Sequence, residues 1–394
     1  MPDTRPAETA QTVCEVCGRT DWYAFAEPRP GQSVTTAGTI VATPLGKAQC
    51  RRCGFVQRIA GGYLGDSDFY IKNYEGYFAR VGAATYDLDR YATMARWVGD
   101  AIGFRQPRTI LDVGCGRGWA MRETHRLFPG AAVWGIEPSE ADSRLARDDG
   151  LEVVRGTLAE AGYRFTDVDL VYSNNVIQHT TSPRAFLGSL FELVGDTGVV
   201  VVTCPDATHP SNEMLWADQN FSFAPSHLVR LAEAAGFAVK AWRRPPNVHH
   251  LRDKQLVVLS RERHPHTYAS DEAPALDIAT SLMLRDGYVK RWAALDFYLL
   301  ERARGARRVF NFGASMWSHL LRGYCPQYWS LVTACIVDGC AGTFMDRDVL
   351  AEVPPVAPGD VIVLGINPEN HPTLERRFRR DGHETVRWDH LIQR

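Results

Sequence analysis

One short stretch decides the fold of this chain: Ile-Leu-Asp-Val-Gly-Cys-Gly-Arg-Gly, residues 110–118. An apolar run, Thr109 to Val113, leads into three alternating glycines, and a segment of helical character, residues 119–128, follows. Glycine lets the backbone turn sharply and approach a ligand closely, and the next helix offers free N–H groups at its N-terminus. The following apolar run ends in Glu137, a carboxylate well placed to accept hydrogen bonds from a ribose. The stretch predicts a strand, turn and helix that bind such a ligand.

Glycine loops of several kinds fit such a unit, and the spacing separates them. A P-loop would need Gly-Lys-Ser or Gly-Lys-Thr after the turn, and neither follows. A dinucleotide loop fits less well, because the spacing here is Gly-x-Gly-x-Gly with Asp112 two residues before the first glycine. That pattern resembles the S-adenosylmethionine (SAM) loop of class I methyltransferases. The alternative is a tight turn that binds no ligand.

The whole chain has the composition of an ordinary globular protein. Its 394 residues, 45% hydrophobic and 23% charged, are enough for two or three domains. The net charge of −2 creates no overall field that would draw the chain to nucleic acid or a membrane surface. No apolar stretch approaches membrane-spanning length, and residues 1–12 lack the apolar core of a signal peptide. We therefore expect a cytoplasmic protein without a membrane partner.

Two cysteine pairs near the N-terminus predict a metal site. Each pair has the form Cys-x-x-Cys-Gly, so the short spacing aims two thiolates at one point. Two such pairs complete a tetrahedral, closed and therefore structural zinc site, with the ligands Cys14, Cys17, Cys50 and Cys53. A thioredoxin-like redox pair or two disulfides are the alternatives. The segment between the pairs, residues 21–49, reads as short strands and turns with little core of its own, so metal binding would supply much of its folding energy.

Strands and helices alternate through the middle of the chain. This pattern predicts a doubly wound sheet whose ligand lies at the C-terminal ends of the strands. The expected strands are residues 109–113, 132–136, 151–155, 168–173, 199–203, 238–242 and 255–260. The expected helices are residues 86–104, with Leu88 and Met94 on its apolar face, and 120–128, 140–147, 183–194 and 225–235.

Polar residues follow the strand at 168–173, where a cofactor edge would lie in this fold. They are Ser173, Asn174 and Asn175, with His179 four residues further on. In class I methyltransferases the corresponding segment lines the methionine end of SAM and its methyl group. His179 has a second interpretation, in which it only caps the following helix.

A third part follows a break rich in His, Pro and Asp that ends near Asp277. A helix over residues 282–301 is followed by strands at 308–312, 332–338, 360–365 and 385–388, with a helix at 373–381. This is a second, smaller α/β unit. Its single Gly313 is a poor cofactor fingerprint, and no second SAM loop is present.

The whole order resembles the zinc-containing, three-domain sugar C-methyltransferases, which act on nucleotide-linked deoxysugars. The resemblance runs from about Cys14 to Leu391 and rests on the cysteine pairs, the loop at 112–118 with residues 135–139, the segment 174–179, and residues 312–315 through 336–338. It implies an α/β fold with an N-terminal zinc-binding domain at 1–70, a Rossmann-like class I SAM methyltransferase domain at 71–262, and a C-terminal α/β domain at 263–394 that helps to form the acceptor pocket. The cofactors implied are SAM and structural Zn²⁺. The SAM-binding residues expected are Asp112, Gly114, Gly116, Gly118, Glu137, Ser173, Asn174 and Asn175.

One segment departs from that family. Its members carry Tyr-x-Glu-His, whose histidine is the proposed base, whereas this chain has Trp-Ala-Asp-Gln at residues 216–219. Gln219 cannot take a proton at neutral pH, although Asp218 could. The resemblance therefore extends to the architecture better than to methylation at carbon.

The leading hypothesis is a SAM-dependent methyltransferase that acts on a small acceptor, a nucleotide-linked sugar or another natural-product intermediate. Carbon, nitrogen and oxygen acceptors are all open. Because transfer needs a nucleophile with a free lone pair, the catalytic candidates are groups that can manage a proton, namely His179, Asp218, His249 and His250. Two alternatives are a zinc-ribbon RNA base methyltransferase, for which the chain lacks an overall basic character, and a SAM-binding module without activity.

Overall fold

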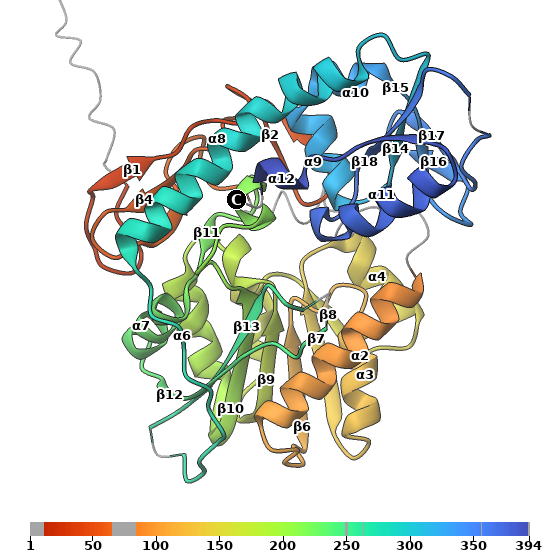
Figure 1. Ribbon diagram of the computed structural model, residues 1–394. Helices are drawn as coiled ribbons and strands as arrows, with labels where there is room; N and C mark the ends of the chain where they lie inside the picture. The colour runs from red at the N-terminus through yellow and green to blue at the C-terminus, as the bar shows by residue number, and fades with distance from the viewer. Residues whose placement is uncertain (1–11, 65–83, 249–250, 263, 356, 393–394) are drawn as a thin grey trace, which may run out of the picture.

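A computed structural model describes residues 12–64, 84–248, 251–262, 264–355 and 357–392, which hold three large sheets and a two-stranded ribbon. Figure 1 shows a seven-stranded sheet in the lower half of the view and the N-terminal and C-terminal sheets above it. The mixed α/β fold expected from the sequence is confirmed. No helix in these ranges is both long enough and apolar enough to cross a bilayer.

The seven-stranded sheet is mostly parallel and reverses its order near its middle. The order is β12-β13-β10-β9-β6-β7-β8, in which β13 alone runs antiparallel to its neighbours. The switch point, where the chain begins to build the other half of the sheet, lies between β6 and β9. The strands are β6 (Thr109–Val113), β7 (Ala132–Glu137), β8 (Val153–Arg155), β9 (Val168–Asn174), β10 (Val194–Pro205), β12 (Ala238–Arg243) and β13 (Lys254–Ser260).

Helices cover both faces of this sheet. The helices α2 (Ala84–Ala101) and α3 (Trp119–Leu127) pack on one face, and α6 (Pro183–Leu193) and α7 (Pro225–Ala234) pack on the other. The helices α4 (Glu140–Asp148) and α5 (Leu158–Ala161) and the 3₁₀ turn η1 (Gly162–Arg164) also lie in the central part.

One residue expected on the apolar face of α2 lies elsewhere. Met94 is buried, whereas Leu88 is 52% exposed, so the apolar residues at helical spacing in α2 are not all buried. Leu88 lies in the first half of α2, whereas the side chains that pack into the sheet begin near Tyr91. The periodicity identified the helix but not where its contact with the sheet begins.

The N-terminal sheet borrows a strand from the middle of the chain. Its order is β1 (Trp22–Ala24), β4 (Lys47–Cys50), β5 (Val56–Arg58) and β11 (Phe221–Ser222). Strand β11 pairs antiparallel with β5, so it joins the N-terminal sheet to the segment that follows β10. The short ribbon β2 (Ser33–Val34) and β3 (Ile40–Val41) forms a separate hairpin, and the 3₁₀ turns η2 (Ile177–His179) and η3 (Asn212–Leu215) lie in the central part.

The C-terminal part is a second α/β unit behind a long helix, α8 (Ile278–Ala303). Its sheet order is β16-β17-β15-β14-β18-β19, parallel except for β16. The strands are β14 (Arg308–Phe312), β15 (Val332–Ile336), β16 (Gly342–Phe344), β17 (Arg347–Leu350), β18 (Asp360–Leu364) and β19 (Glu384–Val386). The helices are α9 (Met316–Tyr324), α10 (Pro326–Leu331), η4 (Pro368–Asn370), α11 (His371–Arg380) and α12 (Asp389–Ile392).

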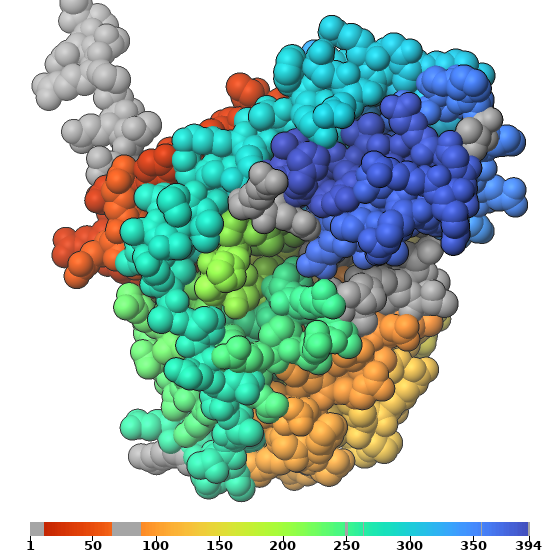
Figure 2. Space-filling view, viewed as in Figure 1, coloured from red at the N-terminus to blue at the C-terminus, as the bar shows by residue number. Residues whose placement is uncertain are grey.

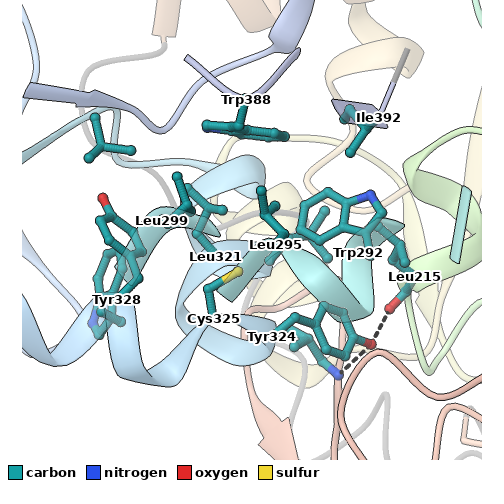
Figure 3. Packing of buried hydrophobic residues seen from close by; sticks show 14 of the residues in the cluster. Leu215, Trp292, Leu295, Leu299, Leu321, Tyr324, Cys325, Tyr328, Trp388 and Ile392 are labelled. Carbon is teal, nitrogen blue, oxygen red and sulfur yellow. Dashed lines mark hydrogen bonds between the residues drawn. The ribbon is translucent and has the colours of Figure 1, made fainter. Parts of the chain in front are cut away.

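The three parts share one hydrophobic cluster. Figure 3 shows Trp292 and Leu295 of α8 packed among Tyr324 and Trp388, with Leu215 of the central part beside them. The Tyr324 hydroxyl donates to the Leu215 carbonyl at 2.6 Å, and Val34 of β2 belongs to the same cluster. In Figure 2 the C-terminal part accordingly rests against the central part. Burial of this shared apolar surface stabilises the arrangement of all three parts together.

Candidate cofactor and acceptor site

In the glycine loop after β6, two glycines pack closely against neighbouring side chains and the third has free space beside its backbone. All three have positive φ, which a side chain would strain. A Cβ at Gly114 would lie 2.4 Å from Val176 Cγ2, and one at Gly118 would lie 2.1 Å from Leu151 Cδ1. A Cβ at Gly116 would meet no atom of the described residues within 4 Å. Gly114 and Gly118 thus fit the loop to its neighbours, whereas Gly116 leaves room for a ligand against the backbone.

Asp112 at the end of β6 is a buried acid without a matching partner. It is 1% exposed, and within the described part of the chain neither carboxylate oxygen accepts a hydrogen bond. Burial raises the pKa of Asp112 to about 8, and the charge of Glu137 adds to this rise. The nearby Tyr172 hydroxyl opposes the rise, although it does not meet the geometry of a hydrogen bond to Asp112. A buried unsatisfied carboxyl is costly, so this one fits a cationic or hydrogen-bond-donating ligand.

Glu137 at the end of β7 closes the other side of the loop. Its Oε2 accepts from the Gly116 backbone N–H at 2.8 Å, and its Oε1 accepts from the Ser139 N–H at 2.7 Å. Burial raises the pKa of Glu137 to about 7, although these two N–H groups oppose the shift. Each carboxylate oxygen has a second lone pair, so Glu137 can hold the loop and still accept from a ligand hydroxyl.

The three polar residues after β9 have different surroundings. The Ser173 hydroxyl donates to the Val113 carbonyl at 3.1 Å, and Asn174 Oδ1 accepts from the Thr203 hydroxyl at 2.9 Å. Both side chains therefore join neighbouring strands. Asn175 has a positive φ of 57°, and its Oδ1 is buried with no hydrogen-bond partner in the described structure. Of the three, Asn175 has the side chain with unused capacity toward a ligand.

The catalytic candidates His179 and Asp218 lie together, as the sequence could not show. His179 Nδ1 is 2.8 Å from the backbone carbonyl oxygen of Asp218 and 3.6 Å from its carboxylate Oδ2. Both residues are buried. Burial lowers the pKa of His179, against the opposing charge of Asp218. The imidazole is therefore neutral at pH 7, which is the form that can accept a proton.

Two glutamines adjoin this pair in the chain. His249 and His250 lie outside the described residues. Gln219 is buried, and its Oε1 has no partner in the part of the chain that the structure describes. Sequence reasoning missed Gln178, which is buried and whose side-chain oxygen and nitrogen have no hydrogen-bond partner in the described structure. Its position next to His179 in the sequence was the feature that could have pointed to it.

A buried lysine also escaped sequence reasoning as part of this region. Lys47 of β4 donates from Nζ to the Glu213 carbonyl oxygen at 2.6 Å. Burial lowers the pKa of Lys47 to about 8, and the charges of Glu213 and Asp218 oppose that shift. Nothing in the residues around Lys47 in the sequence indicates that it is buried.

The four N-terminal cysteines form one cluster. Their Sγ atoms all lie within 4.8 Å of one another, with Cys14 to Cys53 at 3.6 Å and Cys17 to Cys50 at 3.5 Å, and none is in a disulfide. Four thiol sulfurs at one point suit a tetrahedral Zn²⁺ site. The arrangement is compatible with zinc and leaves no disulfide framework here.

Comparisons with known proteins find that the central part of the chain is similar to methyltransferases. Residues 86–241 match a family model described as a methyltransferase domain. A ubiquinone biosynthesis O-methyltransferase of Rhodopseudomonas palustris is 36% identical over 98 residues, which is 24% of this chain and 38% of that protein. A trans-aconitate 2-methyltransferase of Deinococcus radiodurans is 30% identical over 136 residues, 34% of this chain and 52% of that protein.

Solved structures resemble this chain only in part. A SAM-dependent methyltransferase from Mesorhizobium loti aligns with a TM-score of 0.36 and 18% identity, covering 44% of this chain and all (100%) of that one. The chain spans about half or less of the length of the curated relatives named above, 38% and 52%. The central part is a class I SAM-dependent methyltransferase domain, and what the whole chain does is a separate question.

Proposed function

We propose that this chain, built around a SAM-dependent methyltransferase domain, transfers a methyl group from SAM to a small-molecule acceptor. The observation that carries the proposal is the buried, unpartnered Asp112 beside the open backbone at Gly116, at the switch point of the sheet. We assign cofactor contacts to Asp112, Gly116, Glu137 and Asn175, and packing roles to Gly114, Gly118, Ser173 and Asn174, which the sequence had grouped with them.

The residues of this site fit the cofactor by their chemistry. An unpaired carboxyl at Asp112 suits an ammonium group, and Glu137 suits ribose hydroxyls, because a carboxylate accepts hydrogen bonds from both. SAM, when bound, supplies a methyl group on a positively charged sulfur. The protein must then hold the acceptor in line with that methyl group, which is catalysis by positioning.

His179 is the proposed base on the acceptor side. Its Nδ1 faces a carbonyl oxygen, which can only accept, so Nδ1 carries the proton and Nε2 carries the lone pair. A neutral imidazole can remove a proton from an acceptor hydroxyl or from an acidic carbon, and it can keep an acceptor amine unprotonated. Asp218 holds His179 through its backbone carbonyl, and it takes no part as the first proton acceptor.

We propose a nucleotide-linked sugar, or a related natural-product intermediate, as the acceptor. The support is the resemblance of the cysteine pairs, the loop at 112–118 and the C-terminal α/β unit to the three-domain sugar methyltransferases. The substitution of Gln219 for that family's histidine leaves carbon, nitrogen and oxygen open as the methylated atom. The structural zinc is proposed to be held by Cys14, Cys17, Cys50 and Cys53.

The RNA alternative has less support. It would use cations of the zinc segment to grip phosphates, but Lys47 and Arg58 are buried and donate to the backbone carbonyls of Glu213 and Ala217. Arg29 likewise donates to the Gly323 carbonyl at 3.0 Å. These three side chains contact the protein backbone, which leaves the exposed Arg19, Arg51 and Arg52 as the cations of this segment available to a polyanion.

A cofactor-release screen tests the proposed function. The protein is incubated with SAM and with separate pools of nucleotide-linked sugars, amines, phenols and total RNA, and S-adenosylhomocysteine is measured. We expect release with a small-molecule pool, and a loss of at least about 100-fold in turnover for His179→Gln, since a general base contributes about 10² to 10⁴. Release with RNA alone would refute the small-molecule acceptor, and release that His179→Gln leaves intact would refute the base.

A further inference from the structure

The carboxylate of Asp218 is held by a residue from the far N-terminal side of the chain. Thr36 lies in the turn between β2 and β3. Its backbone N–H donates to Asp218 Oδ1 at 2.8 Å, and its hydroxyl donates to Asp218 Oδ2. Both Thr36 and Asp218 have no solvent exposure (0%), so these hydrogen bonds face no competition from bulk water. Both oxygens of this carboxylate therefore have a donor other than His179.

The geometry at His179 differs from that of a simple histidine–aspartate pair. The Nδ1 proton points to the Asp218 carbonyl at 2.8 Å, while the carboxylate Oδ2 stays 3.6 Å away, beyond a hydrogen bond. A carboxylate that accepted this proton directly would stabilise the imidazolium and raise the pKa of His179. The Asp218 carboxylate is close enough to accept the Nδ1 proton after a small rotation. Its two oxygens instead accept hydrogen bonds from Thr36.

Other charged groups face His179 as well. Lys47 of β4 and Lys254 of β13 both lower the pKa of His179, and burial lowers it most. Asp218 is the acidic group that raises it. The protonation state of the imidazole therefore depends on how near the Asp218 carboxylate comes.

The turn that carries Thr36 is fixed from its other side by the C-terminal part. The Val34 N–H donates to the Tyr324 hydroxyl at 3.4 Å, and Arg322 donates to the Gly38 carbonyl at 3.4 Å. A Cβ at Gly38 would lie 2.2 Å from the His319 ring, so the hairpin rests directly on α9. On the side that faces Asp218, the Ala217 N–H donates to the Val34 carbonyl at 2.8 Å. The hairpin is thus clamped between α9 and the segment of Asp218.

We propose that Thr36 is a positioning residue that holds the Asp218 carboxylate away from the imidazole and so keeps His179 neutral. This inference rests on the proposed function of His179 as the acceptor-side base. Thr36 does not touch the acceptor; it acts through Asp218. The clamp on the hairpin makes the C-terminal part a determinant of the state of the base: α9 supports the hairpin, and its Tyr324 hydroxyl also donates to the Leu215 carbonyl near Asp218.

The experiment is a nitrogen NMR titration of the full chain labelled at histidine, with the His179 signals assigned by their loss in His179→Gln. Thr36→Val keeps the shape and removes the hydroxyl. We expect it to free the carboxylate and raise the pKa of His179 by about 1, the lower end of the shift from a nearby opposite charge. Thr36→Ser restores the hydroxyl and should restore the wild-type pKa. Thr35→Val is the matched control: Thr35 Oγ1 accepts within the hairpin, from the Thr39 N–H at 3.2 Å, so the pKa of His179 should not move.

Two outcomes would overturn the inference. One is an unchanged or lower pKa of His179 in folded Thr36→Val; if that variant does not fold, the smaller Thr36→Ala carries the same expectation. The other is an equal rise in Thr35→Val. Calorimetry with S-adenosylhomocysteine separates this inference from the proposed function: no binding by the wild type refutes the function, whereas equal binding by wild type and Thr36→Val with an unmoved pKa refutes only the role of Thr36.

Discussion

Asp112, which we propose as a cofactor contact, is also a buried group that weakens the fold as pH rises. Its pKa of about 8 lies above the ordinary value of 3.8, because burial disfavours the charged form. The folded chain therefore binds a proton at Asp112 that the unfolded chain releases between pH 4 and 8. Stability from this group is thus lost as pH rises through that range. A cationic ligand reverses the preference, since it favours the carboxylate.

We expect Asp112→Asn to separate these two effects. The variant should bind S-adenosylhomocysteine about 10- to 100-fold more weakly, the worth of a charge-assisted hydrogen bond. Without ligand, its melting temperature should equal that of the wild type near pH 4 and exceed it by a growing margin as pH rises toward about 8. The wild type should bind more tightly as pH rises from 6 to 8.5. Calorimetry and thermal melts measure both, and a wild-type affinity that is flat or falls over this range would contradict the assignment.

At the scale of elements, much of the central sheet could be predicted from the sequence. Strand β6 begins and ends where the apolar run does, and the helices around it were expected within a few residues, because periodic burial leaves a periodic pattern. The four-cysteine cluster followed from spacing alone. These features are local, so their signals lie within a few residues of one another.

Contacts between distant segments left no such signal. Strand β11 has two residues and no detectable alternation, yet it completes the N-terminal sheet. Thr36 meets Asp218 across 182 positions of sequence, and the open backbone at Gly116 cannot be told from its neighbouring glycines by spacing. The candidate site was therefore predictable as a set of residue types, while the division into packing, binding and positioning roles required the fold.

At the scale of the whole molecule, the cysteine cluster connects the N-terminal sheet to the acceptor side. Cys50 and Cys53 flank the turn between β4 and β5, and β5 pairs with β11, which follows Asp218 closely in the chain. The loop at 112–118 follows β6 in the seven-stranded sheet, and in the described residues no strand of that sheet pairs with the N-terminal sheet. Loss of zinc should therefore disturb the acceptor side of the site more than the cofactor side.

Metal removal tests that expectation. Elemental analysis should find about one zinc per chain, absent in Cys50→Ser and retained in the control Cys340→Ser, since Cys340 lies outside the cluster. The zinc-free protein should lose thermal stability and acceptor turnover, because structural zinc contributes folding energy, while its affinity for S-adenosylhomocysteine changes by less than about threefold, under about 0.7 kcal/mol. Unchanged zinc content in Cys50→Ser would contradict the metal site, and an equal loss of cofactor binding would contradict the proposed separation.

The central claim is that the loop at 112–118 binds SAM against the backbone of Gly116. Calorimetry with S-adenosylhomocysteine on the wild type, Gly116→Leu and Gly150→Leu tests it most directly. Both glycines have positive φ, 54° and 81°, and no atom of the described structure lies within 4 Å of an added Cβ, so the two substitutions carry similar backbone strain. We predict one site per chain in the wild type and in Gly150→Leu, and no measurable binding in Gly116→Leu. Equal binding by both variants, or none by the wild type, would contradict the account.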